Sequence, residues 1–203
     1  MTETEIFAKS NEEYQALVKR AKACTLCKSQ LPQPPNPVFS APASAKVVII
    51  GQAPGIKAHK SSKPWNDKSG DRLRTWLGIS SHTFYESGYV ALIPMGFCFP
   101  GYRNGADAPP RKECAPAWHA PLLHFLQPKL TILVGRYAQH YYMPEFKSLT
   151  DAVAASPRHN NNMAVLPHPS GRNNRWLGRH PWFEETILPS LATRVSRILP
   201  KTC

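Results

Sequence analysis

Four cysteines are the residues whose type and spacing most directly suggest chemistry. Cys24 and Cys27 form a C-x2-C pair, 70 residues intervene before Cys98, and 15 more separate Cys98 from Cys114. Thiolates are soft ligands that suit either tetrahedral zinc or an iron–sulfur cluster. Structural zinc modules usually supply two close pairs, whereas Cys98 and Cys114 stand far apart. Two interpretations stay open: a four-thiolate site, or a C-x2-C pair beside two ordinary buried thiols. The terminal Cys203 enters neither.

A second candidate is the loop GQAPG at residues 51–55, which follows a β-branched run. Glycine and proline favour a tight turn whose backbone N–H groups can point at an oxygen or a phosphate of a ligand. The loop is not a P-loop, because the Gly-Lys-Ser/Thr ending is missing. A turn that only ends a strand explains the same residues equally well.

The third candidate is the loop HPSGRNNRW at residues 168–176. His168 stands between two prolines, so its backbone has little freedom left to lose when the ring meets a ligand. The residues that follow are suited to grip a phosphate backbone, namely Ser170, Arg172, Asn173 and Arg175. Alternatively, the histidine only caps its own loop.

The fourth candidate is KPWNDKSGD at residues 63–71. Trp65 offers a flat apolar face on which a base can stack, and Asp67 places a carboxylate close by along the chain. Asp71 is expected to be the N-cap of the helix that follows. A tryptophan that simply anchors the core is the alternative for Trp65.

Apolar patterns predict the elements that position these loops. Strands are predicted in KVVIIG (46–51), GYVALIPM (88–95), LTILVG (130–135) and at the start of MAVLPHPSGRN (163–173). Helices are predicted at 11–23, 71–79, 112–126, 136–142 and 181–199. The proline-rich segment 29–45 is expected to be an extended connector.

Strands that alternate with helices predict an α/β fold of three layers, α/β/α, with a central, mainly parallel four-stranded sheet. At 203 residues we expect one domain, with a helix and connector over 1–44 and the α/β core over 45–200. Ligands of such sheets bind beyond the carboxyl ends of the strands. GQAPG and HPSGRN both fall there.

The charge favours a polyanionic partner. Lys and Arg total 25 against 13 Asp and Glu, which gives a formal net charge of +12. Charge alone does not choose between DNA, RNA and an anionic membrane. No run of 18 apolar residues and no signal peptide is apparent, so we expect a soluble cytoplasmic protein without a membrane association, whose cysteines are reduced.

Together these motifs resemble the uracil-DNA glycosylase superfamily, particularly its iron–sulfur families 4 and 5, from Cys24 to about Leu191. GQAPG is similar to the first superfamily motif and HPSGRN to the second. KPWNDKSGDRL is similar to the family 5 loop with its GD-x-SGD pattern, although Asn66 replaces the leading glycine. The C-x2-C and C-x15-C pairs complete the pattern. The order and spacing of these motifs are together specific.

The resemblance implies a uracil-DNA glycosylase-like fold and a monofunctional DNA glycosylase of base excision repair. Such an enzyme flips uracil or a related deaminated base out of DNA and hydrolyses its N-glycosidic bond. Asp67 aligns with the carboxylate that acts on water and sugar, and His168 with the group that stabilises the leaving base. The resemblance assigns the base pocket to Trp65, Gln52 and Ala53, and a structural [4Fe–4S] cluster, in preference to zinc, to Cys24, Cys27, Cys98 and Cys114.

The departures from the family pattern matter as well. Families 1 to 4 carry an acid or an Asn where this chain has Gln52 and Ala53, and neither can act as a base. Either Asp67 carries catalysis, as in family 5, or the chain is a catalytically silent nucleic-acid-binding module with a cluster. The family 4 Asn that reads the uracil edge falls near Pro94, and the candidate substitutes are Asn66 and Asn104. The expected partner is DNA with deaminated bases, bound by a monomer.

Overall fold

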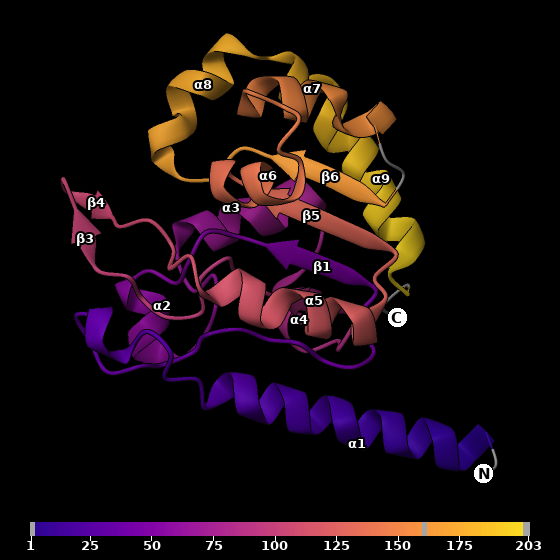
Figure 1. Ribbon diagram of the computed structural model, residues 1–203. Coiled ribbons are helices and arrows are strands. Elements are labelled where there is room, and N and C mark those ends of the chain that lie inside the picture. Colours follow the sequence, from indigo (N-terminus) through magenta and orange to yellow (C-terminus); the bar gives the residue numbers. More distant parts are fainter. Residues whose placement is uncertain (1–2, 160–161, 201–203) are drawn as a thin grey trace.

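Four parallel strands form the centre of the computed structural model, which describes residues 3–159 and 162–200 (Figure 1). Their order across the sheet is β2 (Val90–Leu92), β1 (Val47–Ile50), β5 (Leu130–Val134) and β6 (Met163–Leu166). All neighbouring pairs are parallel. Every residue of β1 and β5 is buried, as continuous apolar strands covered on both faces should be. The predicted parallel sheet is confirmed.

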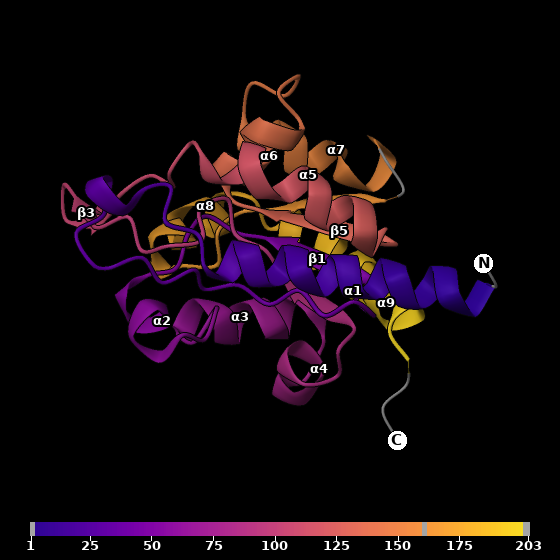
Figure 2. The same cartoon turned by 60° about the horizontal axis from the view of Figure 1, so that its bottom comes forward.

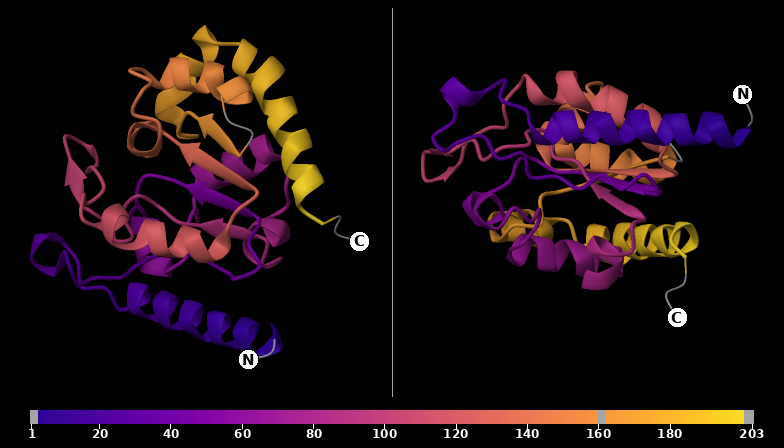
Figure 3. Two further views of the ribbon diagram at one scale, coloured as in Figure 1. Left: turned by 45° about the vertical axis from the view of Figure 1, so that its right-hand side comes forward. Right: turned by 90° about the horizontal axis from the view of Figure 1, so that it is seen from below.

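Helices cover both faces of this sheet, which confirms the three-layer α/β/α architecture (Figures 2 and 3). One face carries α5 (Cys114–Leu126), α6 (Arg136–Tyr142) and α7 (Leu149–His159), with α1 (Glu3–Lys22) packed on α5. The other face carries α3 (Lys68–Leu77), α4 (Ser81–Tyr85) and α9 (Leu188–Ile198), which continues the π-helical segment Phe183–Ile187. Within the described ranges, no helix is long and apolar enough to cross a membrane.

The proline-rich connector reaches the core without forming a regular strand. A short 3-10 helix (Lys28–Gln30) follows the first cysteine pair, and an isolated bridge joins Ser40 to Leu92 of β2. Val38 and Phe39 are buried, and the Val38 N–H donates to the Phe97 carbonyl at 2.7 Å. The connector therefore ties the end of α1 to the edge of the sheet next to Cys98.

The start of α3 differs from the prediction. The helix begins at Lys68, and Asp67 is its N-cap, with Oδ1 accepting from the Gly70 N–H at 2.9 Å. Asp71 lies in the first turn and pairs with Arg74. The prediction that Asp71 is the cap is wrong, because the helix already includes the three residues before it. An acid at the N-cap and one in the first turn both favour a helix start, so composition alone does not separate them.

Several elements, most of them short, were not predicted. They are α2 (Ile56–Ser61), α4, α7, the 3-10 turn Gly171–Asn173, α8 (Asn174–Arg179) and a hairpin of β3 (Tyr102–Arg103) and β4 (Ala106–Asp107). Asn104 and Gly105 join the two hairpin strands, and both have positive φ, 52° and 69°. Two such residues make a type I′ turn, for which Asn-Gly is the preferred sequence. The hairpin lies beyond the carboxyl ends of the sheet strands (Figure 1).

Candidate active site

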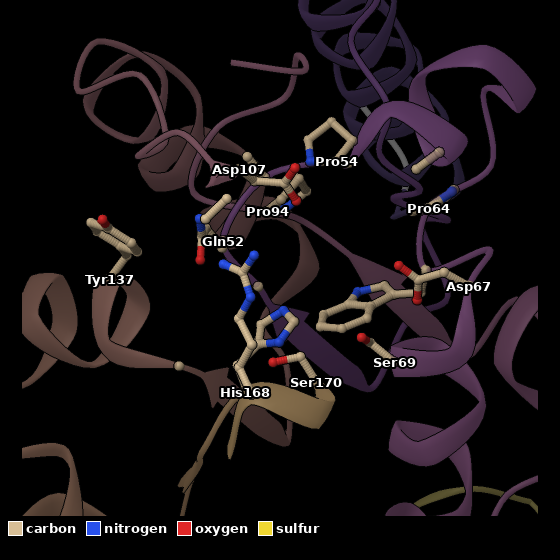
Figure 4. Close-up of a pocket in the computed structure, with 18 of the residues that line it drawn as sticks. Gln52, Pro54, Pro64, Asp67, Ser69, Pro94, Asp107, Tyr137, His168 and Ser170 are labelled. Atoms are coloured by element: carbon tan, nitrogen blue, oxygen red, sulfur yellow. The ribbon is translucent and has the colours of Figure 1, made fainter. Parts of the chain in front are cut away.

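A cavity of about 760 Å³ opens at the carboxyl ends of the sheet strands. The chain segments that follow all four strands contribute to its wall: 51–55 after β1, Pro94 after β2, 135–137 after β5 and the loop from His168 after β6. The segment 64–69 and the hairpin complete it (Figure 4). The cavity therefore lies where a parallel α/β sheet is expected to bind its ligand.

Trp65 is held in one wall of this cavity by its neighbours. Its backbone is left-handed, with φ 56°, and the Tyr85 hydroxyl donates to its carbonyl at 2.9 Å. A Cβ at Gly51 would lie only 2.6 Å from Cζ2 of the indole, and a Cβ at Gly70 would overlap the Trp65 carbonyl oxygen. Two of the glycines in the sequence motifs are thus needed so that the indole can lie against the end of β1. The ring packs on the core and also lines the cavity.

His168 lies beside the indole. Its ring stacks with that of Trp65, with centroids 5.6 Å apart and planes inclined by 26°. The Asn173 side chain donates to the His168 carbonyl at 2.6 Å and so fixes the turn that carries the ring. Burial lowers the pKa of His168, and the nearby Asp67 carboxylate opposes this shift. The imidazole is therefore neutral at neutral pH and can donate one N–H.

Asp67 lines the cavity from the beginning of α3. Its Oδ1 is occupied by the capping bond to Gly70, which leaves the second carboxylate oxygen for other partners. The same residue therefore starts a helix and presents negative charge to the cavity. The cap holds the side chain in place, because an N-cap bond restricts its rotamers.

Asp107 is a second cavity carboxylate, which the sequence analysis missed. It comes from β4, and Figure 4 shows it across the cavity from Asp67. Its Oδ2 would lie 3.4 Å from a Cβ at Gly55, so it stands against the GQAPG loop. Partial burial raises the pKa of Asp107, Arg172 lowers it, and Asp67 raises it. The Asn-Gly turn was the signal that could have placed this acid, since a two-residue hairpin turns the chain back toward the loop.

The other predicted site residues divide into two groups. Those that line the cavity are Gln52, Ala53, Ser170, Arg172 and Asn173. Those that are not among its lining residues are Asn66, Asn104 and Arg175. Asn66 is exposed and donates to the Ser61 hydroxyl, and Asn104 occupies the hairpin turn. The two asparagines proposed to read the base edge therefore do not reach this cavity in the structure.

Pro94 lies in the cavity wall, and its backbone carbonyl is already engaged. His119 Nε2 lies 3.0 Å from the Pro94 oxygen, and His119 Nδ1 lies 2.7 Å from the Tyr142 hydroxyl. Since the carbonyl can only accept, Nε2 carries the proton and Nδ1 accepts from the tyrosine. Burial lowers the pKa of His119 to about 4, so the ring stays neutral. This network holds the wall but adds no polar group to the cavity at Pro94.

The four cysteines converge on a second, smaller cavity away from the sheet ends. Cys24, Cys27, Cys98 and Cys114 all line it, together with apolar residues and Arg111. Within residues 3–159 and 162–200, no group of three or more His, Cys, Asp or Glu forms a site for a metal ion. The thiols thus surround a common space without forming a site for a single ion.

Three observations suit this second cavity to a sulfur-bridged cluster. The Phe97 N–H donates to Cys114 Sγ at 3.3 Å, and the Asn36 backbone lowers the pKa of Cys98, although burial raises the pKa of both thiols. Nε of Arg111 is buried and has no hydrogen-bond partner among the described residues. Hydrogen bonds to the ligating sulfurs and the local charge are among the features by which proteins tune thiolate-bound clusters. The residues present therefore fit such a group.

A comparison with protein families matches most of this chain to one family. The sequence model of the uracil DNA glycosylase superfamily matches residues 37–192. This range begins in the connector, includes the four sheet strands and both cavity loops, and ends within α9. Cys98 and Cys114 lie inside it, whereas Cys24 and Cys27 precede it. The match covers well over half of the chain, and together with the fold and the cavity it shows that this protein belongs to the uracil DNA glycosylase superfamily.

Proposed function

We propose that this protein is a monofunctional DNA glycosylase that hydrolyses the N-glycosidic bond of uracil or a related deaminated base and leaves an abasic site. The observation that carries the proposal is the convergence of Trp65, Asp67 and His168 on one cavity. A flipped base needs a concave pocket with an aromatic face. Cleavage also needs an acid near the sugar and a donor near the base. Trp65, Asp67 and His168 are proposed to supply the aromatic face, the acid and the donor.

The carboxylates account for the chemistry at the sugar. Loss of the base proceeds through an oxocarbenium-like sugar, and negative charge nearby stabilises it. Asp67 is proposed to stabilise C1′ and to accept a proton from the attacking water. The water oxygen bonds to C1′, the bond from C1′ to the base nitrogen breaks, and its electron pair leaves with the base. Asp107 supplies the second carboxylate that Gln52 and Ala53 cannot provide.

His168 accounts for the leaving group. Negative charge grows on the departing base, and an N–H aimed at its carbonyl oxygen stabilises that charge. The neutral imidazole needs no prior protonation for this role. No base fits between the Trp65 and His168 rings, because two van der Waals contacts need about 7 Å and the ring centroids are 5.6 Å apart. In this proposal the base stacks on the cavity side of the indole, and His168 meets its edge.

The loop that carries His168 also supplies the groups for the DNA backbone. Ser170, Arg172 and Asn173 line the same cavity and offer hydroxyl, guanidinium and amide donors. Phosphate contacts of this kind position the strand without reading sequence. The net charge of +12 adds a general attraction for DNA. Extruding a nucleotide costs a few kcal/mol, which these contacts and the stacking face must offset.

We further propose that the four thiolates hold a [4Fe–4S] cluster. Its contribution is structural, because hydrolysis of a glycosidic bond moves no electrons. The cluster would join the segment after α1, the segment after β2 and the start of α5, which supply Cys24 and Cys27, Cys98, and Cys114. The purified protein should be brown and should contain iron and acid-labile sulfide. A colourless protein with stoichiometric zinc would contradict the assignment.

The experiment for the function uses the purified full-length protein and a set of oligonucleotides. Single and double strands with one uracil, hypoxanthine or xanthine are incubated with it, and abasic sites are then cleaved with alkali. We expect strand scission on at least one substrate, and loss of scission in Asp67→Asn. Glu86→Gln is the control, since this exposed carboxylate at the end of α4 pairs with His82 and is not among the lining residues. Salt-sensitive binding without scission on any substrate favours a silent binding module instead.

A further inference from the structure

The hairpin of residues 102–107 carries an exposed aromatic ring at the mouth of the active-site cavity. Tyr102 is 64% exposed, and among the described residues only Leu26 and Tyr141 are other large apolar side chains with comparable exposure. Of these three, Tyr102 alone lines the cavity. An aromatic side chain at the rim of a binding cavity is placed to contact a ligand as it enters, and tyrosine is enriched at such interfaces.

The ring is held in place before any partner arrives. The Asn104–Gly105 turn closes the hairpin in its preferred type I′ geometry, and the Phe99 and Tyr102 rings pack edge to face with centroids 5.2 Å apart. Arg172 donates to the Gly105 carbonyl at 2.7 Å and so ties the hairpin to the loop of His168. Binding therefore loses little conformational entropy at this ring.

The charges around the ring fit nucleic acid. Arg103 follows Tyr102 directly and is exposed, and Arg172 lies behind the turn. The acid of the hairpin, Asp107, is the cross-strand partner of Tyr102 and also lines the cavity. The two arginines of the hairpin and the His168 loop are suited to phosphates, and the exposed ring is suited to a base.

We propose that Tyr102 inserts into duplex DNA and occupies the place in the base stack that the flipped nucleotide leaves. Proteins that distort duplexes commonly place an apolar or aromatic wedge between base steps, which offsets the lost stacking. The inference rests on the proposed function, since it assumes that the cavity takes a flipped nucleotide. It also makes a distinct claim: the ring should matter more for double strands than for single strands, where no stack has to be opened.

The first test compares single-turnover cleavage of one uracil in a duplex and in the matching single strand. Stacking on a base is worth about 1–3 kcal/mol, so Tyr102→Ala should lose about 10-fold or more on the duplex relative to its loss on the single strand. Tyr102→Phe should restore the ratio, because the ring is what stacks. Tyr141→Ala is the matched control, an exposed tyrosine of α6 that is 45% exposed and does not line the cavity. Equal losses on both substrates would overturn the inference.

A second test needs no catalysis. A duplex with a tetrahydrofuran abasic analogue flanked by 2-aminopurine reports by fluorescence whether a ring enters the stack. Wild-type protein and Tyr102→Phe should change the signal at saturation, and Tyr102→Ala should not. If no substrate is cleaved but this signal depends on Tyr102, the glycosylase proposal fails and the wedge stands. If cleavage occurs and the signal is the same in all variants, the wedge fails and the glycosylase stands.

Discussion

The two cavities of this molecule are built in different ways. The active-site cavity is open, lies at the carboxyl ends of all four strands and exposes polar side chains from loops. The cysteine cavity is small, lies outside the sheet and is lined by thiols, apolar residues and one arginine. Loops on a rigid sheet can vary their chemistry without loss of the fold. The segments around the thiols also meet through the packing of α1 on α5 and the Val38–Phe97 hydrogen bond, and the proposed cluster would add a further link between them.

This contrast predicts that damage to the two cavities has different consequences. Changes around the thiols should reduce the free energy of unfolding. Changes in the active-site cavity should reduce activity while the fold persists. Four substitutions test the contrast, in order of decreasing expected effect.

The largest effect is expected from Cys114→Ser. Cys114 is buried at the start of α5, and its loss removes one of four proposed ligands. We expect loss of bound iron and a decrease of at least about 3 kcal/mol in the free energy of unfolding, seen by iron analysis and thermal melting. Cys203→Ser is the control, since the terminal cysteine belongs to no proposed site. A Cys114→Ser variant with normal iron content and a normal melting temperature would contradict both the cluster assignment and its contribution to stability.

The second effect concerns Asp67, which caps a helix and is proposed to act in catalysis. Asp67→Asn should lower the single-turnover rate by at least about 100-fold. Its melting temperature should stay near that of the wild type, because Asn caps a helix as well as Asp does. Asp67→Ala should lose the same activity and also about 1 kcal/mol of stability. An active Asp67→Asn variant would show that the carboxylate is needed only as a cap.

The third substitution is Gly51→Ala. The new Cβ would lie 2.6 Å from the Trp65 indole, so the ring has to move. Overpacking of this kind costs about 1–3 kcal/mol, and we expect a rate decrease of about 10-fold from the displaced stacking face. The double variant with Trp65→Phe should recover stability, because the smaller ring lacks the clashing atoms. Gly178→Ala is the control, since nothing lies within 4 Å of a Cβ there. Full activity in Gly51→Ala would argue against the indole as the base-stacking wall.

The smallest effect is expected from Asp107→Asn and depends on pH. Partial burial raises the pKa of Asp107 above its ordinary value of 3.8. Below that value the folded and unfolded states are both protonated, so the group does not affect stability. As the pH rises through the raised pKa, the folded state holds its proton longer and stability falls. Asp107→Asn should therefore melt above the wild type at neutral pH, and this difference should shrink toward about pH 4.

The same variant bears on activity. If Asp107 helps at the sugar, it must be ionised, so the acid limb of the wild-type rate profile should follow its raised pKa. That limb should shift to lower pH in Asp107→Asn. Asp151→Asn is the control, an exposed aspartate of α7 bonded to Ser148. An unchanged profile would leave Asp67 as the only active carboxylate.

Local apolar patterns in the sequence were enough to predict most strands and helices of the fold. The four strands and five of the helices lie where apolar periodicity predicts them, because a continuous β-branched run can be satisfied only inside a sheet covered on both faces. The errors fall at mostly short elements, at the missed helix α7, and at the starts of α1 and α3, which begin at Glu3 and Lys68 where residues 11 and 71 were predicted. Asp67 and Asp71 both suit a helix N-terminus, and local composition does not decide between them. In the structure, Asp67 Oδ1 accepts from the Gly70 N–H and caps the helix.

The candidate site was only partly predictable. Loops that follow parallel strands must meet at one edge, so the convergence of GQAPG with His168 follows from topology. The absence of Asn66 and Asn104 from the cavity lining does not follow from topology, because it depends on the direction in which each turn points its side chains. Asp107 was missed because its hairpin has two residues in each strand, too few for a periodic signal.

The sequence by itself determined the parallel sheet, the loops that carry polar residues and the four thiols, because these follow from local apolar runs and residue types. Only the tertiary structure decided that Asp67 and Asp107 share the cavity, that the Trp65 indole lies in its wall and that Tyr102 lies at its mouth. The physical reason is that these outcomes depend on close packing between segments far apart in the chain. The close approach of the Trp65 indole to Gly51, where a Cβ would lie only 2.6 Å from the ring, cannot be read from a local pattern.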